Sequence, residues 1–379
     1  MRRTTFAGTI FLAGCASTMP WQRPTPAMVT TCDTMYYASA RARRDGRVVR
    51  AVGGALEYGF VVNAVRVVAD TTARYTAKFD ARQVDSVELG RDAFLHAVAR
   101  ADSAAARRNE GPVIYVHGFA VAFERGVAQA LDIATRGAFR GPVILFAWPT
   151  HSAVATWPSA VAPLTQAYRD DSAMAAAAGE QFRQLLAELR GAARPGAITV
   201  VGHSLGGQLV AEALATASPL HDALTRDPIG VVALFAPDVP AARFRDSLAP
   251  ALVPLARRRV LYASRNDVML GISSLVNGGP RTGRLVTGAP AAVPGFETVD
   301  VTDGARADGA FRKVVEPKHA MRWASSAIYD FFSVVRGVPS ECRSNSAYAR
   351  QESTDVWSLV GGPIPLHPPA PTGATVPSC

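Results

Sequence analysis

The chain has 379 residues, of which 49% are hydrophobic and 19% are charged, and its formal net charge is +9. This composition predicts a globular protein with a sizeable core and excludes a chain that is disordered throughout. The basic residues occur in short runs, as at residues 41–44 and 257–259, without the interleaved aromatic residues of a nucleic-acid-binding surface, so no nucleic-acid partner is expected.

The first fifteen residues have the form of a bacterial lipoprotein signal. Met1-Arg2-Arg3 is basic, residues 4–14 form a short apolar run, and the sequence LAGC at residues 12–15 resembles a lipobox. We expect a signal peptide over 1–15, acylation of Cys15, and an exported protein anchored to a membrane of the cell envelope, facing the periplasm or the surface. The alternative is an ordinary signal peptide with a chance cysteine. No later run reaches the ~18 apolar residues of a transmembrane helix.

The chain contains four cysteines. If Cys15 is acylated, Cys342 can pair with Cys32, which would join the two ends of the main domain, or with Cys379, and the sequence leaves both pairings open. No Cys and His spacing is typical of zinc ligation, so no metal site is expected.

Residues 16–33 are rich in Pro, Thr and Ser and are expected to form a tether. Short β-type runs between 34 and 79 predict the first strands, and residues 91–108 have helical spacing. Beyond Gly337 the sequence is again rich in Pro, Gly and Ser, which predicts a mobile tail over 338–379. The main domain is therefore predicted to span residues 34–337.

Within that domain, apolar runs alternate with segments of helical spacing. The runs that predict strands lie at residues 112–116, 142–147, 197–201, 229–235, 259–264 and 296–301. Helices are expected at residues 123–135 and 167–189, directly after Ser204, and at residues 321–335. Unbroken apolar strands that alternate with helices predict an α/β fold, with a mostly parallel sheet covered by helices on both faces.

The sequence GHSLG at residues 202–206 follows a Val-rich strand and opens a helix. This is the context in which a G-x-S-x-G motif forms a nucleophile elbow, a sharp turn that exposes the serine at the edge of the sheet. Ser204 is therefore the predicted nucleophile, and the backbone N–H of Leu205 is a predicted oxyanion-hole donor. The neighbouring His203 is expected to pack beside the elbow.

A second glycine-containing turn, His117-Gly118-Phe119, follows an earlier strand. It matches the loop that supplies the other oxyanion donor in such sheets, here the N–H of Phe119 or of Ala120. His117 is expected to orient this loop by hydrogen bonds.

A serine nucleophile needs a base, usually a histidine that is held by a carboxylate. In this fold the acid and then the histidine follow the serine along the chain. His319 lies between the last predicted strand and the closing helix, which makes it the predicted base. Asp267 follows the strand at 259–264 and is the preferred acid; Asp238, after the preceding strand, is the alternative, and Asp303 is a weaker third choice.

Several short motifs occur in a characteristic order. They are MYYASAR at 35–41, VHGF at 116–119, WP at 148–149, YRD at 168–170, GHSLG at 202–206, APD at 236–238 with Phe244, and LYASRND at 261–267. Together they resemble a bacterial α/β-hydrolase family long described as a domain of unknown function and grouped with esterases and lipases. The resemblance spans residues 34–335 and implies a serine hydrolase with Asp267 and His319 in the triad.

The sequence departs from the family pattern at three places. Leu205 stands where the family often has Met, Lys318 stands where it often has Gly, and a second Trp157-Pro158 extends the loop after Trp148-Pro149. The family does not fix a substrate.

These features predict a carboxylic-ester hydrolase that acts on a small-molecule or lipid ester through an acyl-enzyme. The chemistry requires no cofactor and implies no obligate protein partner. Two alternatives stay open. The acyl group can pass to an envelope lipid or glycan instead of water, or the fold can serve as a binding module that has lost catalysis.

Overall fold

The computed structural model describes residues 28–70, 74–79, 85–151, 161–285, 292–307, 325–343 and 348–360. The strands are β1 (Met28–Arg44), β2 (Arg47–Asp70), β3 (Arg74–Phe79), β4 (Asp85–Leu89), β5 (Val113–Val116), β6 (Val143–Ala147), β7 (Thr199–His203), β8 (Ile229–Phe235), β9 (Ala256–Ala263), β10 (Glu297–Asp300), β11 (Ala349–Ser353) and β12 (Val356–Leu359). The helices are α1 (Arg91–Ala105), α2 (Phe123–Arg136), α3 (Val161–Ala177), α4 (Gly179–Ala192), α5 (Leu205–Ala215), α6 (Pro219–Arg226), α7 (Ala241–Arg243), α8 (Ala249–Leu252), α9 (Val268–Val276), α10 (Thr302–Ala307) and α11 (Ser325–Val335).

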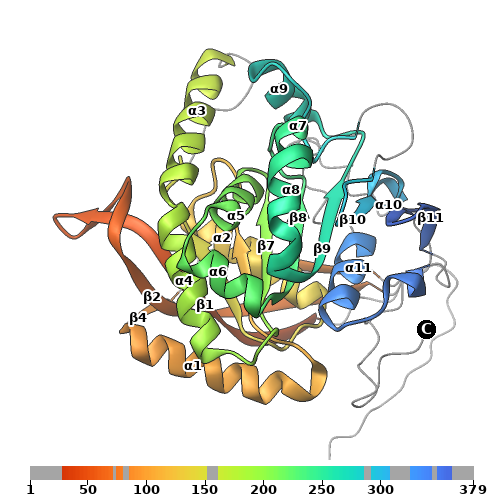
Figure 1. Cartoon of the computed structure of the whole chain (residues 1–379). Helices are drawn as coiled ribbons and strands as arrows, with labels where there is room; N and C mark the ends of the chain where they lie inside the picture. Colours follow the sequence, from red (N-terminus) through yellow and green to blue (C-terminus); the bar gives the residue numbers. More distant parts are fainter. Residues whose placement is uncertain are drawn as a thin grey trace, which may run out of the picture.

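The strands of the described segments form one 12-stranded sheet with the order β11-β12-β10-β9-β8-β7-β5-β6-β1-β2-β3, and β4 pairs with β2 (Figure 1). Neighbouring strands from β12 to β1 run parallel, whereas β11, β2, β3 and β4 pair antiparallel at the two sides. Because parallel strands end at the same edge, the segments that follow β5, β7, β8 and β9 meet there. The predicted α/β-hydrolase fold, with a mostly parallel sheet, is confirmed.

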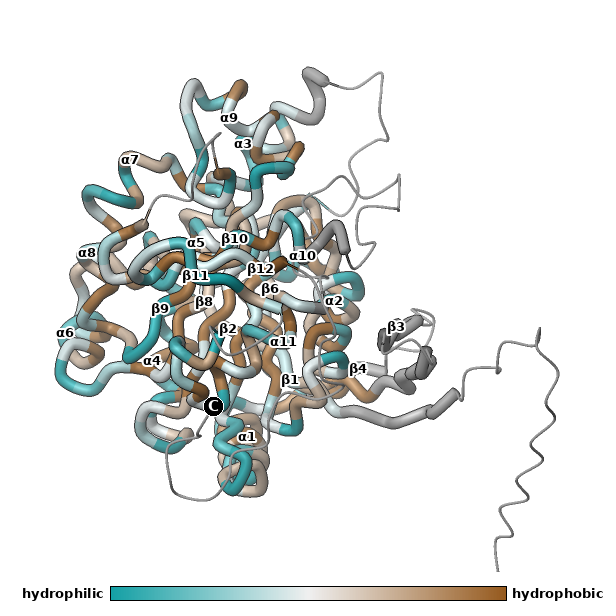
Figure 2. Tube along the Cα trace, turned by 90° about the vertical axis from the view of Figure 1, so that its right-hand side faces the viewer, coloured by the Kyte–Doolittle hydropathy of each residue, from teal (hydrophilic) through white to brown (hydrophobic). Residues whose placement is uncertain are grey.

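Two apolar clusters lie on opposite faces of the sheet, because successive side chains of each strand point to opposite sides. In β7, Val200 belongs to the cluster that is covered by α1, α4, α5 and α6, and Val201 belongs to the cluster under α2 and α11. Figure 2 shows the hydrophobic residues concentrated on the central strands and the hydrophilic ones on the outer helices.

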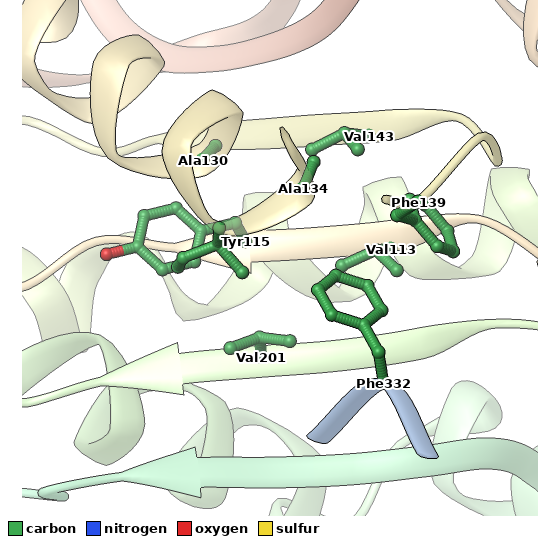
Figure 3. Close-up of a pocket in the computed structure, with 9 residues that line it drawn as sticks. Val113, Tyr115, Ala130, Ala134, Phe139, Val143, Val201 and Phe332 are labelled. Atoms are coloured by element: carbon green, nitrogen blue, oxygen red, sulfur yellow. The ribbon is translucent and has the colours of Figure 1, made fainter. Parts of the chain in front are cut away.

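A small apolar cavity lies beneath α2, between the sheet and α11 (Figure 3). Its lining includes Ala130 and Ala134 of α2, Val201 of β7 and Phe332 of α11. The one polar group in Figure 3, the Tyr115 hydroxyl, donates a 3.0 Å hydrogen bond to the side chain of Gln129. This cavity is therefore a gap in core packing and not a substrate site.

Residues 338–343 and 348–360 differ from the mobile tail that the sequence predicts over 338–379. A 3₁₀ turn (Ser340–Arg343) leads to the hairpin β11–β12, and β12 adds to the sheet beside β10. The run Val356-Trp357-Ser358-Leu359 is buried, with Trp357 only 2% exposed. Burial of four consecutive residues offsets the polar composition around them, so the main domain extends beyond Gly337 to Val360.

Three further expectations either differ from the structure in detail or remain open. Strand β1 begins at Met28, inside the predicted tether. The helix expected over 167–189 is two helices, α3 and α4, which meet at Ala178. Cys342 is disulfide-bonded, and the side chains of the other cysteines lie outside the described part of the chain, so the choice of partner stays open.

Candidate active site

Ser204 occupies the sharp turn between β7 and α5. Its backbone angles are φ 55° and ψ −123°, a conformation that costs a non-glycine residue of order 1–3 kcal/mol. The turn is held from outside, because the Ser204 N–H donates to Phe235 O at 3.0 Å and the Asp238 N–H donates to Ser204 O at 3.1 Å. Strand β8 and the residues after it therefore maintain the strained position of Ser204.

Close packing at the elbow explains the need for Gly206. A Cβ at this position would collide with the backbone oxygens of Val116 and His117, at the end of β5. The first turn of α5 can therefore approach β5 only with glycine at this position. This contact brings the elbow against the loop that follows β5.

The loop after β5 lies directly beside the Ser204 side chain. A Cβ on Gly118 would stand 2.9 Å from Ser204 Cβ. Ala120 has a left-handed φ of 51°, and the Phe119 ring packs against Tyr168 of α3 at 5.7 Å between centroids. The backbone N–H groups of this loop are thus held next to the candidate nucleophile.

A buried carboxylate fixes this loop from the α3 side. Asp171 is 0% exposed, and its Oδ2 accepts the Ala120 N–H at 3.1 Å. Its Oδ1 accepts the His151 backbone N–H at 2.9 Å and lies 2.8 Å from His151 Nδ1, while Arg50 approaches to 3.8 Å. The Ala120 N–H is therefore occupied, and of the two predicted donors the Phe119 N–H is the one without a hydrogen bond to any described residue.

His117 and Trp148 also support this loop. Their rings stack with centroids 5.2 Å apart, and Trp148 Nε1 donates to His117 O at 2.8 Å. Burial lowers the pKa of His117 to about 4, so the ring is neutral at physiological pH. This agrees with the expected orienting role.

Asp238, the alternative acid, is already engaged by three side chains. Its Oδ1 lies 2.5 Å from Arg281 Nε and accepts the Ser273 hydroxyl at 2.8 Å, and its Oδ2 accepts the Tyr168 hydroxyl at 2.7 Å. Arg281 also donates to Asp238 O at 2.7 Å, and both members of this ion pair are buried. The carboxylate therefore neutralises a buried guanidinium.

Asp267 lies just past β9 and is 0% exposed. Its Oδ1 accepts the Leu270 N–H at 2.9 Å and so caps α9. Asp303 is exposed at the start of α10. The structure thus brings Ser204, the loop at 117–120 and the two candidate acids to one edge of the sheet. The predicted base, His319, lies in residues 308–324, outside the described part of the chain.

The model of one protein family matches residues 101–311, more than half of the chain, and is described as alpha/beta hydrolase of unknown function (DUF900). The chain belongs to this family. No curated protein matches the hydrolase. Its family confirms the resemblance that the motifs indicate, and the sheet edge described above is where hydrolases of this fold carry their catalytic groups.

Several solved structures are similar to the hydrolase. A predicted CIB-like hydrolase from Thermoplasma acidophilum has 10% identity and a TM-score of 0.32, with 82% of this chain and 100% of that chain covered. A post-proline cleaving enzyme from Rickettsia typhi has 11% identity and a TM-score of 0.30, with 83% and 52% covered. Prolyl oligopeptidase B from Galerina marginata has 10% identity and a TM-score of 0.28, with 81% and 44% covered. The hydrolase thus spans about half of each peptidase.

Three side chains at the site were not predicted from the sequence as site residues: Asp171, Arg281 and Ser273. Asp171 follows the YRD motif directly, and its spacing of three residues from Tyr168 places both on one face of α3. That spacing was the available signal. Arg281 carries no such signal, because its partner Asp238 is 43 residues away in the chain.

Replacing Asp171 with alanine is expected to lower kcat by about 10²-fold, since loss of a single oxyanion donor costs about 10²–10³-fold. The variant removes the acceptor that holds Ala120 and frees the loop beside Ser204. Asp170→Ala is the matched control, because Asp170 is partly exposed and contacts Arg50 at 3.5 Å. Equal kcat values for the two variants, at equal thermal stability, would contradict the role of Asp171.

The low pKa of His117 predicts a pH-dependent stability. Between pH 6.5 and about 4 the unfolded chain takes up a proton on this histidine and the folded chain does not, so acid favours unfolding. Over this interval the free energy of unfolding is expected to fall by roughly 3 kcal/mol through His117. Denaturant titrations of wild type and His117→Gln across this range measure the difference; parallel pH profiles for the two proteins would refute it.

Among the described residues, no group of three or more His, Cys, Asp or Glu is placed to hold a metal ion. None of the helices in the same segments is long and apolar enough to cross a membrane.

Proposed function

We propose that this hydrolase cleaves carboxylic esters through an acyl-enzyme on Ser204. His319 takes the proton of the hydroxyl, and Asp267 holds the imidazole and stabilises its charged form. The N–H groups of Phe119 and Leu205 stabilise the oxyanion, and water then releases the acyl group. The observation that carries the proposal is the strained Ser204, held beside the loop of Gly118.

The engagement of Asp238 supports Asp267 as the acid. Both oxygens of Asp238 have partners, including the positive charge of Arg281. Asp267 is buried at the end of the next strand, and its Oδ1 caps α9.

The proposal extends to location and substrate class. Acylation of Cys15, which lies outside the described residues, would hold the hydrolase on an envelope membrane and favour small-molecule or lipid esters. No cofactor takes part in the proposed chemistry.

The direct test is labelling of the full chain with a biotinylated fluorophosphonate, which reacts only with an activated serine. Mass mapping of the tryptic digest is expected to find the probe on the peptide that contains Ser204, and p-nitrophenyl esters are expected to be hydrolysed. Heat-denatured protein is the control. Absence of both labelling and hydrolysis would overturn the proposal in favour of a binding module. Labelling with release of the acyl group only to an added alcohol acceptor would make it an acyltransferase.

A further inference from the structure

The hairpin of β1 and β2 ends in a basic tip beyond the body of the molecule, visible as the orange-red ribbon in Figure 1. The ten residues 41–50 read RARRDGRVVR and hold five arginines against one aspartate. Asp45 and Gly46 form the turn, with φ values of 50° and 74°. Positive φ at both central residues is typical of the tight two-residue hairpin, so the tip has a defined shape.

Three of the five arginines have interaction partners within the protein. Arg43 pairs with Glu57 at 2.6 Å and with Glu88 at 2.7 Å. Arg50 lies 3.5 Å from Asp170, and the Arg41 guanidinium lies over the Phe123 ring, 4.6 Å from its centroid. These three side chains are therefore part of the folded body.

Arg44 and Arg47 differ from the other three. They face each other directly in the register of the hairpin, next to the turn, and both are exposed. Among the described residues, no carboxylate lies within ion-pair distance of either one. Like charges directly opposite one another destabilise a hairpin, so this pair weakens the tip unless an outside anion neutralises it.

The tip also exposes an apolar side chain, on the other face of the hairpin from these two charges. Val48 is 42% exposed and lies opposite Arg43, one residue beyond Arg47. A hairpin tip that exposes arginines on one face and an apolar side chain on the other fits end-on contact with a membrane surface, where anionic headgroups neutralise the charge and the acyl boundary receives the apolar group. A nucleic-acid phosphate backbone would satisfy the charge alone.

Topology places the tip on the side of the molecule that carries Ser204. Strand β1 runs parallel to β6, with Ser39 level with Ala147 at the edge where the strands end. Arg44 lies five residues further along β1, past two irregularities in the pairing with β2, and Arg50 on the returning strand lies 3.8 Å from Asp171, which holds the loop beside Ser204. The tip therefore projects from a part of the molecule that lies next to the candidate active site.

We propose that the end of this hairpin docks on an anionic phospholipid surface through Arg44, Arg47 and Val48. The inference concerns binding and stands independently of the proposed esterase activity, which Arg44 and Arg47 do not touch.

The test compares Arg44→Gln/Arg47→Gln with Arg107→Gln/Arg108→Gln in the full chain carrying Cys15→Ser, so that acylation contributes nothing. Arg107 and Arg108 are also adjacent and exposed, but they lie before β5, at the opposite edge of the sheet. Binding is measured by co-sedimentation with vesicles of phosphatidylcholine alone, or mixed with phosphatidylglycerol, at low and high salt.

Binding is expected for the mixed vesicles alone, weakened by salt, and about 30-fold weaker for the tip variant, since each arginine near an anionic surface contributes about fivefold. The control variant should bind like the parent chain, and both should hydrolyse soluble esters at the parent rate. Equal weakening of the two variants, or equal binding to neutral vesicles, would overturn the proposal. Tip-dependent binding to duplex DNA without vesicle binding would reassign the tip to nucleic acid.

Discussion

Ser204→Ala is expected to abolish ester hydrolysis, with a fall in kcat on the order of 10⁵–10⁶-fold, as for the loss of a nucleophile whose triad acts as a unit. The fold should be unaffected. Ser204 makes no side-chain cap hydrogen bond within the described residues, and alanine keeps the Cβ that already tolerates φ 55°. The loss would therefore be purely chemical, and steady-state kinetics together with fluorophosphonate labelling measure it.

A glycine variant adds a second measurement at the same position. Ser204→Gly removes the same hydroxyl but also relieves the backbone strain, so the free energy of unfolding should rise by about 1 kcal/mol. The matched control is Ser218→Ala, which deletes the cap of α6 and should lose about 1 kcal/mol of stability with full activity. Retention of activity by Ser204→Ala would contradict the proposed mechanism, whatever the effect on stability.

Local sequence patterns were sufficient to predict the central part of the fold and the elbow. The Val-rich run before GHSLG forms β7, Leu205 begins α5, and Ser204 has the positive φ that a strand-to-helix elbow requires. These features depend on a few adjacent residues, because burial on both faces selects apolar strands and the close approach to β5 selects Gly206. Such constraints are visible in a single sequence.

The features that were missed depend on contacts between distant segments. Asp171 holds Ala120 across 51 residues and Arg281 meets Asp238 across 43, and neither contact leaves a periodic pattern. Strand β12 is four residues long within a polar region, and it is a strand because it pairs with β10, some 60 residues earlier in the chain. Tertiary pairing determined these parts, and local composition could not indicate it.

Changing each of the two candidate acids to asparagine is expected to give different effects on kcat and on stability. Asp267→Asn keeps an oxygen that can accept the Leu270 N–H, so α9 stays capped, but it removes the charge that stabilises the imidazolium. A loss in kcat of about 10⁴-fold is expected, comparable to the same change in a known triad, with little change in thermal stability.

Asp238→Asn should do the reverse. It leaves the buried guanidinium of Arg281 without its counter-charge, which is expected to cost about 3–5 kcal/mol of stability, while kcat of the folded protein changes by less than about tenfold. Should this variant fail to fold, the double variant Asp238→Asn/Arg281→Gln removes both charges and restores a measurable protein. A 10⁴-fold loss in the double variant, with Asp267→Asn close to wild type, would assign the acid to Asp238. The two residues are thus distinguished by which quantity moves: the acid of the triad lowers the rate constant, and the buried ion-pair partner lowers the free energy of unfolding.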